Sequence, residues 1–245
     1  NVAVGHLSLF SNTTASNNTA VGYQAGYSNT TGSSIDAFVA YALQANTTGG
    51  NNAALSRYAL NANTTGSSNT AAGSAAMASN TTGSFNVGIG QQALWGNTTA
   101  SNNTAVGYQA GYTGQSNYAI ALGYLSGEFN QGLNSVCIGN ASGVFSQDQN
   151  AIAIGTNAGY TGQIGNAVAI GNNTGQTNQG IAAVALGVSA GQSGQGTNAV
   201  SIGAQAGQNS QGNYGVAIGS SSGANQGATA IAIGQNAGRT NQTTG

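Results

Sequence analysis

The sequence is poor in charge, cysteine and proline, and each shortage limits what the protein can be. Only 2% of the 245 residues are charged, lysine is absent and the net charge is -1. No basic surface is therefore available to neutralise nucleic-acid phosphates or anionic lipid, and we expect no nucleic-acid partner. The single cysteine, Cys137, cannot form an internal disulfide, and we interpret it as a small core residue. The absence of proline fits a chain in which nearly every backbone N–H donates to a strand ladder.

Long apolar runs are missing as well. No stretch of about 18 apolar residues occurs, so we expect no membrane span in this sequence. The sequence also starts without an initiator methionine or a signal-like segment, so we read it as a fragment whose anchor is supplied elsewhere.

One short pattern recurs along the whole chain and organises it. Its clearest copy is Asn166–Gly171, with the sequence Asn-Ala-Val-Ala-Ile-Gly. Self-similarity at a fixed period is typical of a solenoid, so we expect one all-β repeat domain over residues 1–245, a parallel β-solenoid of about 15 coils of 16–17 residues. Within it, Asn-Thr-Thr-Gly turns mark residues 1–106 and Gln- and Gly-rich turns mark residues 107–245, and we expect turn residues such as Gln195 to be exposed. The closing residues of the copies are Gly5, Gly22, Ala40, Ser56, Gly73, Gly90, Gly107, Gly123, Gly139, Gly155, Gly171, Gly187, Gly203, Gly219 and Gly234.

Large and small residues alternate before each closing residue. Val, Ile, Leu or Thr usually stands one and three positions before it, and a small residue stands two before it in every copy but one, where Phe38 is the exception. Period-2 geometry places these on opposite faces of a short strand, and we expect the large residues to form the core. We expect glycine to permit a sharp corner after this strand. A second strand is expected at the small residues that follow the corner, such as Ala158 and Ala190. The outward stripe of small residues would pack against sister chains, because a monomer seldom exposes so long an apolar patch. The expected interface residues are Ala20, Ala54, Ala121, Cys137, Ala153, Ala169, Ala185, Ala217 and Ala232.

The pattern resembles a known family. Asn-Ala-Val-Ala-Ile-Gly followed by x-x-Ala-Gly is similar to the head repeats of YadA-like trimeric autotransporter adhesins. Asn18–Gly26 and Asn103–Gly111, with their Asn-Thr-Thr-Gly turns, resemble repeats of phage tail fibres. The resemblance implies a left-handed parallel β-roll assembled as a parallel homotrimer. The period of 16–17 residues is longer than the typical head repeat, and the chain carries far less charge.

Catalytic and metal-binding motifs are weak. Gly187–Gly191 and Gly219–Gly223 match the nucleophile-elbow pattern only because the repeat places glycine at both ends. The one histidine, His6, lies many coils from either serine, and a catalytic triad needs contact. Only Asp36, Glu128 and Asp148 are acidic, whereas calcium-binding rolls carry acidic residues in every repeat. We therefore expect no enzyme, no metal site and no cofactor.

Aromatic residues recur at two positions of the coil. Their flat apolar faces and polar edges suit contact with sugars, and the alternative is that they only cover the corners. The candidate glycan or receptor contacts are Tyr23, Tyr27, Trp95, Tyr108, Tyr112 and Tyr160.

Sequons fall in register on one side of the coil. They are candidates for N-glycosylation if the chain passes through a secretory pathway, and otherwise they supply turn chemistry. The sequon asparagines are Asn12, Asn29, Asn63, Asn80 and Asn97. The threonines beside them form a hydroxyl ladder, which is the basis for a third hypothesis, ice binding.

These features favour a non-catalytic extracellular attachment rod, an adhesin head or shaft or a virion tail fibre, located on a cell or virion surface. Its expected partners are two further copies of itself and a cell-surface glycan or receptor. A self-assembling structural filament is the alternative.

Overall fold

The computed structural model describes residues 1–239, and in these residues it contains short strands and turns but no helix. The chain is an all-β parallel β-solenoid of about 14 turns, which we call coils, and this confirms the solenoid that the repeat predicts. It divides into two compact units, Asn1–Leu122 and Gly123–Gly245. The last six residues of the expected segment 107–245 lie outside the described part of the chain.

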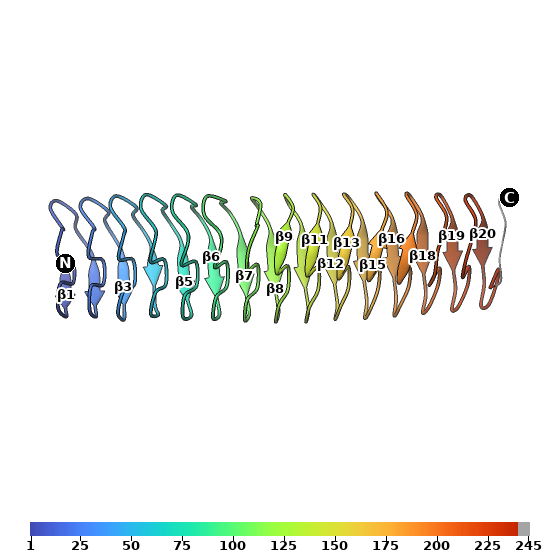
Figure 1. The fold of residues 1–245 in the computed structure, drawn as a ribbon, viewed down its shortest axis with the longest axis horizontal. Helices are drawn as coiled ribbons and strands as arrows, with labels where there is room; N and C mark the ends of the chain where they lie inside the picture. The colour runs from blue at the N-terminus through green and yellow to red at the C-terminus, as the bar shows by residue number, and fades with distance from the viewer. Residues whose placement is uncertain (240–245) are drawn as a thin grey trace. The chain divides into compact units, whose positions relative to one another are not determined.

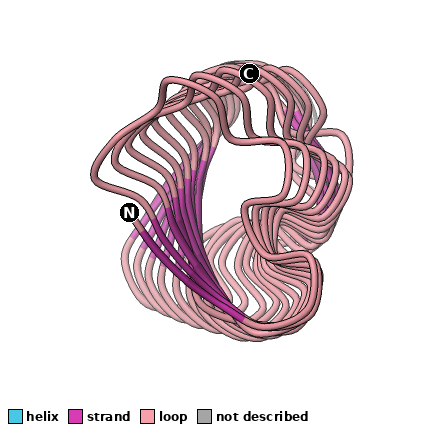
Figure 2. Cartoon of the chain, turned by 90° about the vertical axis from the view of Figure 1, so that its left-hand side faces the viewer, coloured by secondary structure: helices cyan, strands magenta, loops and turns pink. Residues whose placement is uncertain are grey.

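The first unit contains one strand per coil (Figure 1). Each strand pairs in parallel with the strand of the next coil, so that Ala3 lies opposite Ala20 and Ala20 opposite Ala37. Figure 2 shows these strands one behind another on one side of the coil, with turns completing the circuit. The strands are β1 (Val2–Val4), β2 (Thr19–Val21), β3 (Asp36–Phe38), β4 (Ala53–Ala54), β5 (Thr70–Ala72), β6 (Val87–Ile89), β7 (Thr104–Val106) and β8 (Ile120–Leu122).

The second unit contains two parallel sheets. The first continues the repeat pattern, and its strands are β10 (Val136–Ile138), β12 (Ile152–Ile154), β14 (Val168–Ile170), β16 (Val184–Leu186), β18 (Val200–Ile202), β19 (Val216–Ile218) and β20 (Ile231–Ile233). The second consists of β9 (Phe129–Gln131), β11 (Phe145–Gln147), β13 (Thr161–Gln163), β15 (Thr177–Gln179) and β17 (Ser193–Gln195). The expected second strand is therefore misplaced, because Ala158 and Ala190 lie in turns.

Glycine closes most strands because two backbones approach closely there. Gly155 has a φ of +126°, a value that L side chains rarely adopt, and an ideal Cβ on it would lie 2.4 Å from the carbonyl oxygen of Gly171. This confirms the role expected for the corner glycines.

The two faces of the main strand are reversed relative to the prediction. The alanines in the middle of the strands point into the coil, and Ala153, Ala169 and Ala185 have an exposed fraction of 0%. The larger residues on either side of them point outward and are half-buried or exposed. In the second unit the opposite wall leaves little room for Val or Ile at these positions, because an ideal Cβ on Gly159 would already lie 3.1 Å from the Cβ of Ala153 and 2.6 Å from Oε1 of Gln163. All nine expected interface residues, Ala20, Ala54, Ala121, Cys137, Ala153, Ala169, Ala185, Ala217 and Ala232, are buried in the chain's own coil, so the predicted interface is wrong.

In the coil of β3 the closing position lies one residue earlier than the sequence alignment of the copies placed it. Phe38 pairs with Val21, and therefore Val39, not Ala40, occupies the closing position opposite Gly22. The small inward residue of this coil is then Ala37, which is fully buried. Phe38 lies on the outer face, and the apparent exception to the small-residue rule disappears.

Candidate interaction surfaces

A buried asparagine ladder runs through the first unit at the sequon positions. The side-chain nitrogen of Asn63 donates to Oδ1 of Asn46 at 2.7 Å and to the carbonyl of Gly66 at 2.9 Å. Asn80 repeats this arrangement on Asn63 and Gly83. Each amide thus satisfies its neighbour in a dry interior, where an unpaired polar group is costly.

This ladder removes the sequons as glycan sites in the folded chain. Of the sequon asparagines, Asn29, Asn63 and Asn80 are fully buried, Asn97 is nearly so and Asn12 is half-buried. The nitrogen that would carry a glycan is a hydrogen-bond donor inside the coil in each of them, Asn12 included, which donates to the carbonyl of Ala15. The expectation of glycosylation at these residues is therefore wrong for the folded state.

A glutamine ladder takes the corresponding place in the second unit. Gln179 donates from its side-chain nitrogen to the carbonyl of Val168 at 2.8 Å and to Oε1 of Gln195 at 3.1 Å. Gln195 in turn donates to the carbonyls of Val184 and Ala199, and only 2% of it is exposed. These glutamines form part of the core, although sequence reasoning placed them on an exposed turn.

The threonines form two adjacent rows, and only in one of them do the hydroxyls donate hydrogen bonds within the chain. Thr30 and Thr64 donate from Oγ1 to the threonine carbonyl of the next coil, at 2.9 and 3.1 Å. The next residue of each pair is exposed instead and has no hydrogen bond from its hydroxyl. This second row consists of Thr14, Thr31, Thr48, Thr65, Thr82 and Thr99.

The aromatic candidates stack on neighbouring rings. Tyr23 lies on His6, with ring centroids 5.6 Å apart, and meets the edge of Tyr41. Tyr27 stacks on Phe10 at 5.4 Å, and Trp95 stacks on Tyr112 at 5.2 Å. Stacking along the solenoid covers ring faces and leaves edges toward solvent, so these rows offer hydroxyl and edge contacts more than open stacking platforms.

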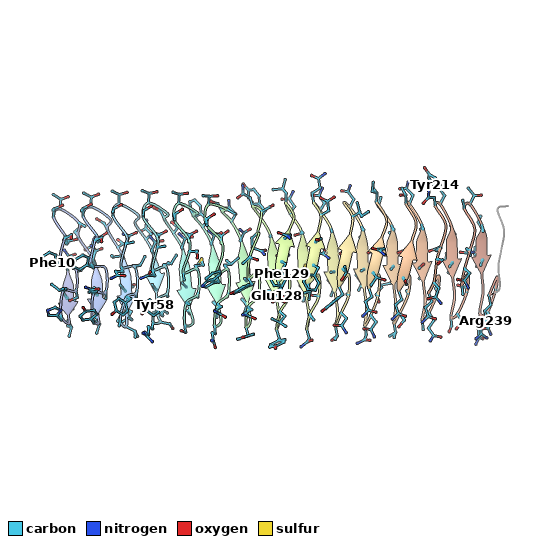
Figure 3. The ribbon with its side chains drawn as sticks, viewed as in Figure 1. Phe10, Tyr58, Glu128, Phe129, Tyr214 and Arg239 are labelled. Atoms are coloured by element: carbon cyan, nitrogen blue, oxygen red, sulfur yellow. The ribbon has the colours of Figure 1, made fainter. Side chains whose placement is uncertain are left out.

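The two remaining candidates are Tyr160 and Tyr108. Tyr160 and Phe145 meet edge to face, and Phe145 stacks on Phe129, which is labelled in Figure 3. Tyr108 is exposed over 40% of its surface. The corner-covering interpretation and the contact interpretation are both compatible with this arrangement.

Cys137 is deeply buried within the second unit. Burial raises the pKa of its thiol from 9.0 to about 12, although hydrogen bonds with the Gln131 side chain and the Gly127 backbone act in the opposite direction. The prediction that it is a small core residue is confirmed. Among residues 1–239 no group of three His, Cys, Asp or Glu side chains lies close enough to hold a metal ion.

The outer face of the main sheet is the surface that sequence reasoning missed. In the first unit it exposes Val4, Leu55 and Ile89, and in the second it exposes Leu186 and Ile202. These residues were assigned to the core, because alternation shows two faces but does not say which one is inside. We call the outward residues of β1 to β8, together with Leu55 directly after β4, the first aliphatic face. The outward residues of β10, β12, β14, β16, β18, β19 and β20 form the second.

No protein-family model, curated protein or solved structure matches the chain. The resemblance to YadA-like head repeats therefore stays a prediction. The structure, over the residues that it describes, has no helix long and apolar enough to cross a membrane.

Proposed function

We propose that this chain is a non-catalytic, extracellular attachment protein that works as a homotrimer and displays repeated side chains to a glycan or receptor. In this proposal three copies wind as left-handed β-rolls like the adhesin heads that the repeat resembles, and they stand on a cell or virion surface.

The observation that carries the proposal is the pair of exposed aliphatic faces. A strand such as β16 turns Ala185 inward and leaves Leu186 with 43% of its surface in water. The same choice recurs from coil to coil, so apolar side chains form a row along each unit. Burying such a row is worth about 25 cal/mol per Å², and a second copy of the same chain offers a row with the same spacing. The faces therefore support assembly through Val, Ile and Leu instead of through alanine.

Recognition would use the other sides of the coil. There the chain presents rows of aromatic rings and amides at coil-to-coil spacing, including the bonded pair Gln192 and Gln208. Tyrosine hydroxyls and amides suit the hydroxyl groups of a neutral glycan, and repetition gives many weak contacts at once.

Two measurements test this function. Sedimentation equilibrium and native mass spectrometry of the 245-residue chain should give a discrete trimer, and Leu186→Ser with Ile202→Ser should shift it toward monomer. Thr65→Ser, on an exposed turn, is the matched control. A glycan array or cell-binding assay should then show binding that the trimer retains and the monomeric variant loses. A monomer at every concentration contradicts the proposal, and long polymers would favour the structural filament.

Ice binding is a second candidate because of the exposed threonine row. Its hydroxyls recur once per coil, at about 4.8 Å, and make no bond within the chain. Thermal hysteresis in a droplet assay, lost in a Thr48→Val, Thr65→Val double variant, would support it. Absence of hysteresis in the unaltered chain would exclude it.

A further inference from the structure

One charged residue interrupts the first aliphatic face. Asp36 begins β3, points outward and is exposed, between Thr19 of the preceding coil and Ala53 of the next. The other outward residues of β1 to β8 are uncharged. The Asp36 carboxylate has no hydrogen bond or ion pair with any other described residue of its chain.

An arginine lies one coil further along, beyond the end of the neighbouring strand. Arg57 follows β4 and is exposed. Its guanidinium lies 4.6 Å from the ring centroid of Tyr58 and donates to the Tyr58 hydroxyl at 3.1 Å. Tyr58, labelled in Figure 3, stacks in turn on Tyr41 at 4.9 Å. This support holds the guanidinium at the corner where the strands end.

Within one chain, over the residues that the structure describes, the two charges form no ion pair with each other, and Arg57 contacts Tyr58 instead. Asp36 lies opposite Ala53, and Arg57 is four residues past Ala53. Arg57 lies in the turn that follows β4, where its guanidinium is held on Tyr58, and the coils are about 4.8 Å apart. Each charge is therefore exposed and able to form an ion pair with another copy of the chain.

Parallel copies around an axis would bring the two charges together. If the first aliphatic faces turn toward a common axis, the strands run around it, and the end of one copy's strand meets the start of the next copy's strand. Arg57 of one copy then faces Asp36 of its neighbour, one coil away along the axis. The offset of about 4.8 Å is within reach of an arginine side chain, and the small Ala53 leaves room above the carboxylate.

We propose that Asp36 of one copy and Arg57 of the next form an ion pair that fixes the axial register of the assembly. This inference rests on the proposed self-association. The aliphatic faces alone repeat every coil, so copies could slip by one coil and bury nearly the same apolar area. A slip would separate the charges and leave Asp36 buried without a partner, which is strongly unfavourable. A single polar pair in an apolar interface specifies alignment in the same way as a buried asparagine in a coiled coil.

A charge-swap experiment on the whole chain tests this pair. Asp36→Arg and Arg57→Asp should each weaken self-association, measured by sedimentation equilibrium, by about tenfold or more. The double variant Asp36→Arg, Arg57→Asp should recover most of the loss. Arg239→Glu changes the other arginine and serves as the control, with unchanged association. Circular dichroism confirms that all four variants fold.

The outcomes separate this inference from the proposed function. If the unaltered chain is monomeric at all concentrations, the proposed assembly fails and the ion pair fails with it. If the unaltered chain associates but the double variant stays as weak as the single ones, the ion pair alone is refuted. Recovery in the double variant, together with a salt dependence that both single variants lose, supports the pair.

Discussion

Two neighbouring residues of β16 give the sharpest test of which face of the strand is inside. Ala185 is fully buried, and its methyl group lies 3.2 Å from where an ideal Cβ on Gly191 would be, while Oε1 of Gln195 would lie 2.7 Å from that same point. There is no free volume for a larger side chain. Ala185→Leu must push these groups apart, and overpacking of this kind costs about 1–3 kcal/mol of unfolding free energy or more.

Leu186 should tolerate a much larger chemical change. It already exposes 43% of its surface, so folding buries only a little over half of it. Full burial of a leucine is worth about 1.5–3 kcal/mol, and Leu186→Ser should therefore lower the unfolding free energy by only about 1 kcal/mol, with no cavity penalty. If Leu186 were a core residue, its loss would instead cost about 2–5 kcal/mol.

Guanidinium unfolding followed by far-ultraviolet circular dichroism measures the difference. The comparison is made at concentrations where both variants are monomeric, so that self-association does not contribute. We expect Ala185→Leu to lower the midpoint of the second unit further than Leu186→Ser. The reverse order would refute the inside–outside assignment and, with it, the exposed aliphatic faces.

Three further predictions concern single sites. Val39 has a φ of +81°, which strains a β-branched residue by about 1–3 kcal/mol, so Val39→Gly should raise the melting temperature; a fall would show that the corner is relaxed around valine. Asn63→Ala removes two buried donors and leaves Asn80 without its acceptor, so it should cost about 1–3 kcal/mol in a denaturant titration, whereas the exposed Thr65→Ala should change little. The thiol of Cys137 should resist iodoacetamide at about pH 8 until the chain is unfolded, and fast alkylation of the folded chain would contradict its burial. Its pKa rises from 9.0 to about 12 on folding, so the unfolded state loses the proton first. The stability that this thiol contributes therefore declines as the pH rises from about 9 to about 12.

The repeat period was sufficient to predict most of the backbone. The pattern around Asn166–Gly171 predicted short parallel strands, and β14 pairs in register with the copies on either side of it. The corner role of Gly155 also followed from sequence, since only glycine adopts its φ without strain. These features depend on the conformational preference of single residues and on the spacing of the repeat, and both can be read from the sequence without knowing the packing.

The orientation of the faces could not be predicted in the same way. Alternation separates Ala169 from Val168 and Ile170, but either set could face inward. The choice depends on how wide the coil is, and that width is set by groups such as Gln179 on the opposite wall. Sequence reasoning placed the glutamine row on the surface and therefore left the interior empty for the larger residues. The candidate surfaces changed as a consequence.

The two units fill corresponding parts of their interiors with different residues. Leucine on one wall of the coil gives way to glycine in the second unit, and glutamine appears on the opposite wall. In the first unit Leu60 and Leu94 reach into the core from a left-handed backbone, with φ values of 50° and 51°, and this conformation costs about 1–2 kcal/mol for such residues. In the second unit glycine takes the same conformation without that cost, as at Gly175, but contributes no side chain. The glutamine of the opposite wall fills the gap, and Oε1 of Gln179 would lie 2.7 Å from a Cβ on Gly175. The leucine of the first unit and the glutamine of the second are thus alternative occupants of the same position in the coil. The coil of Gly26 has neither, and there the side chains of Leu9 and Ile35 lie nearest to the glycine, with Cδ atoms 3.0 and 3.5 Å from an ideal Cβ.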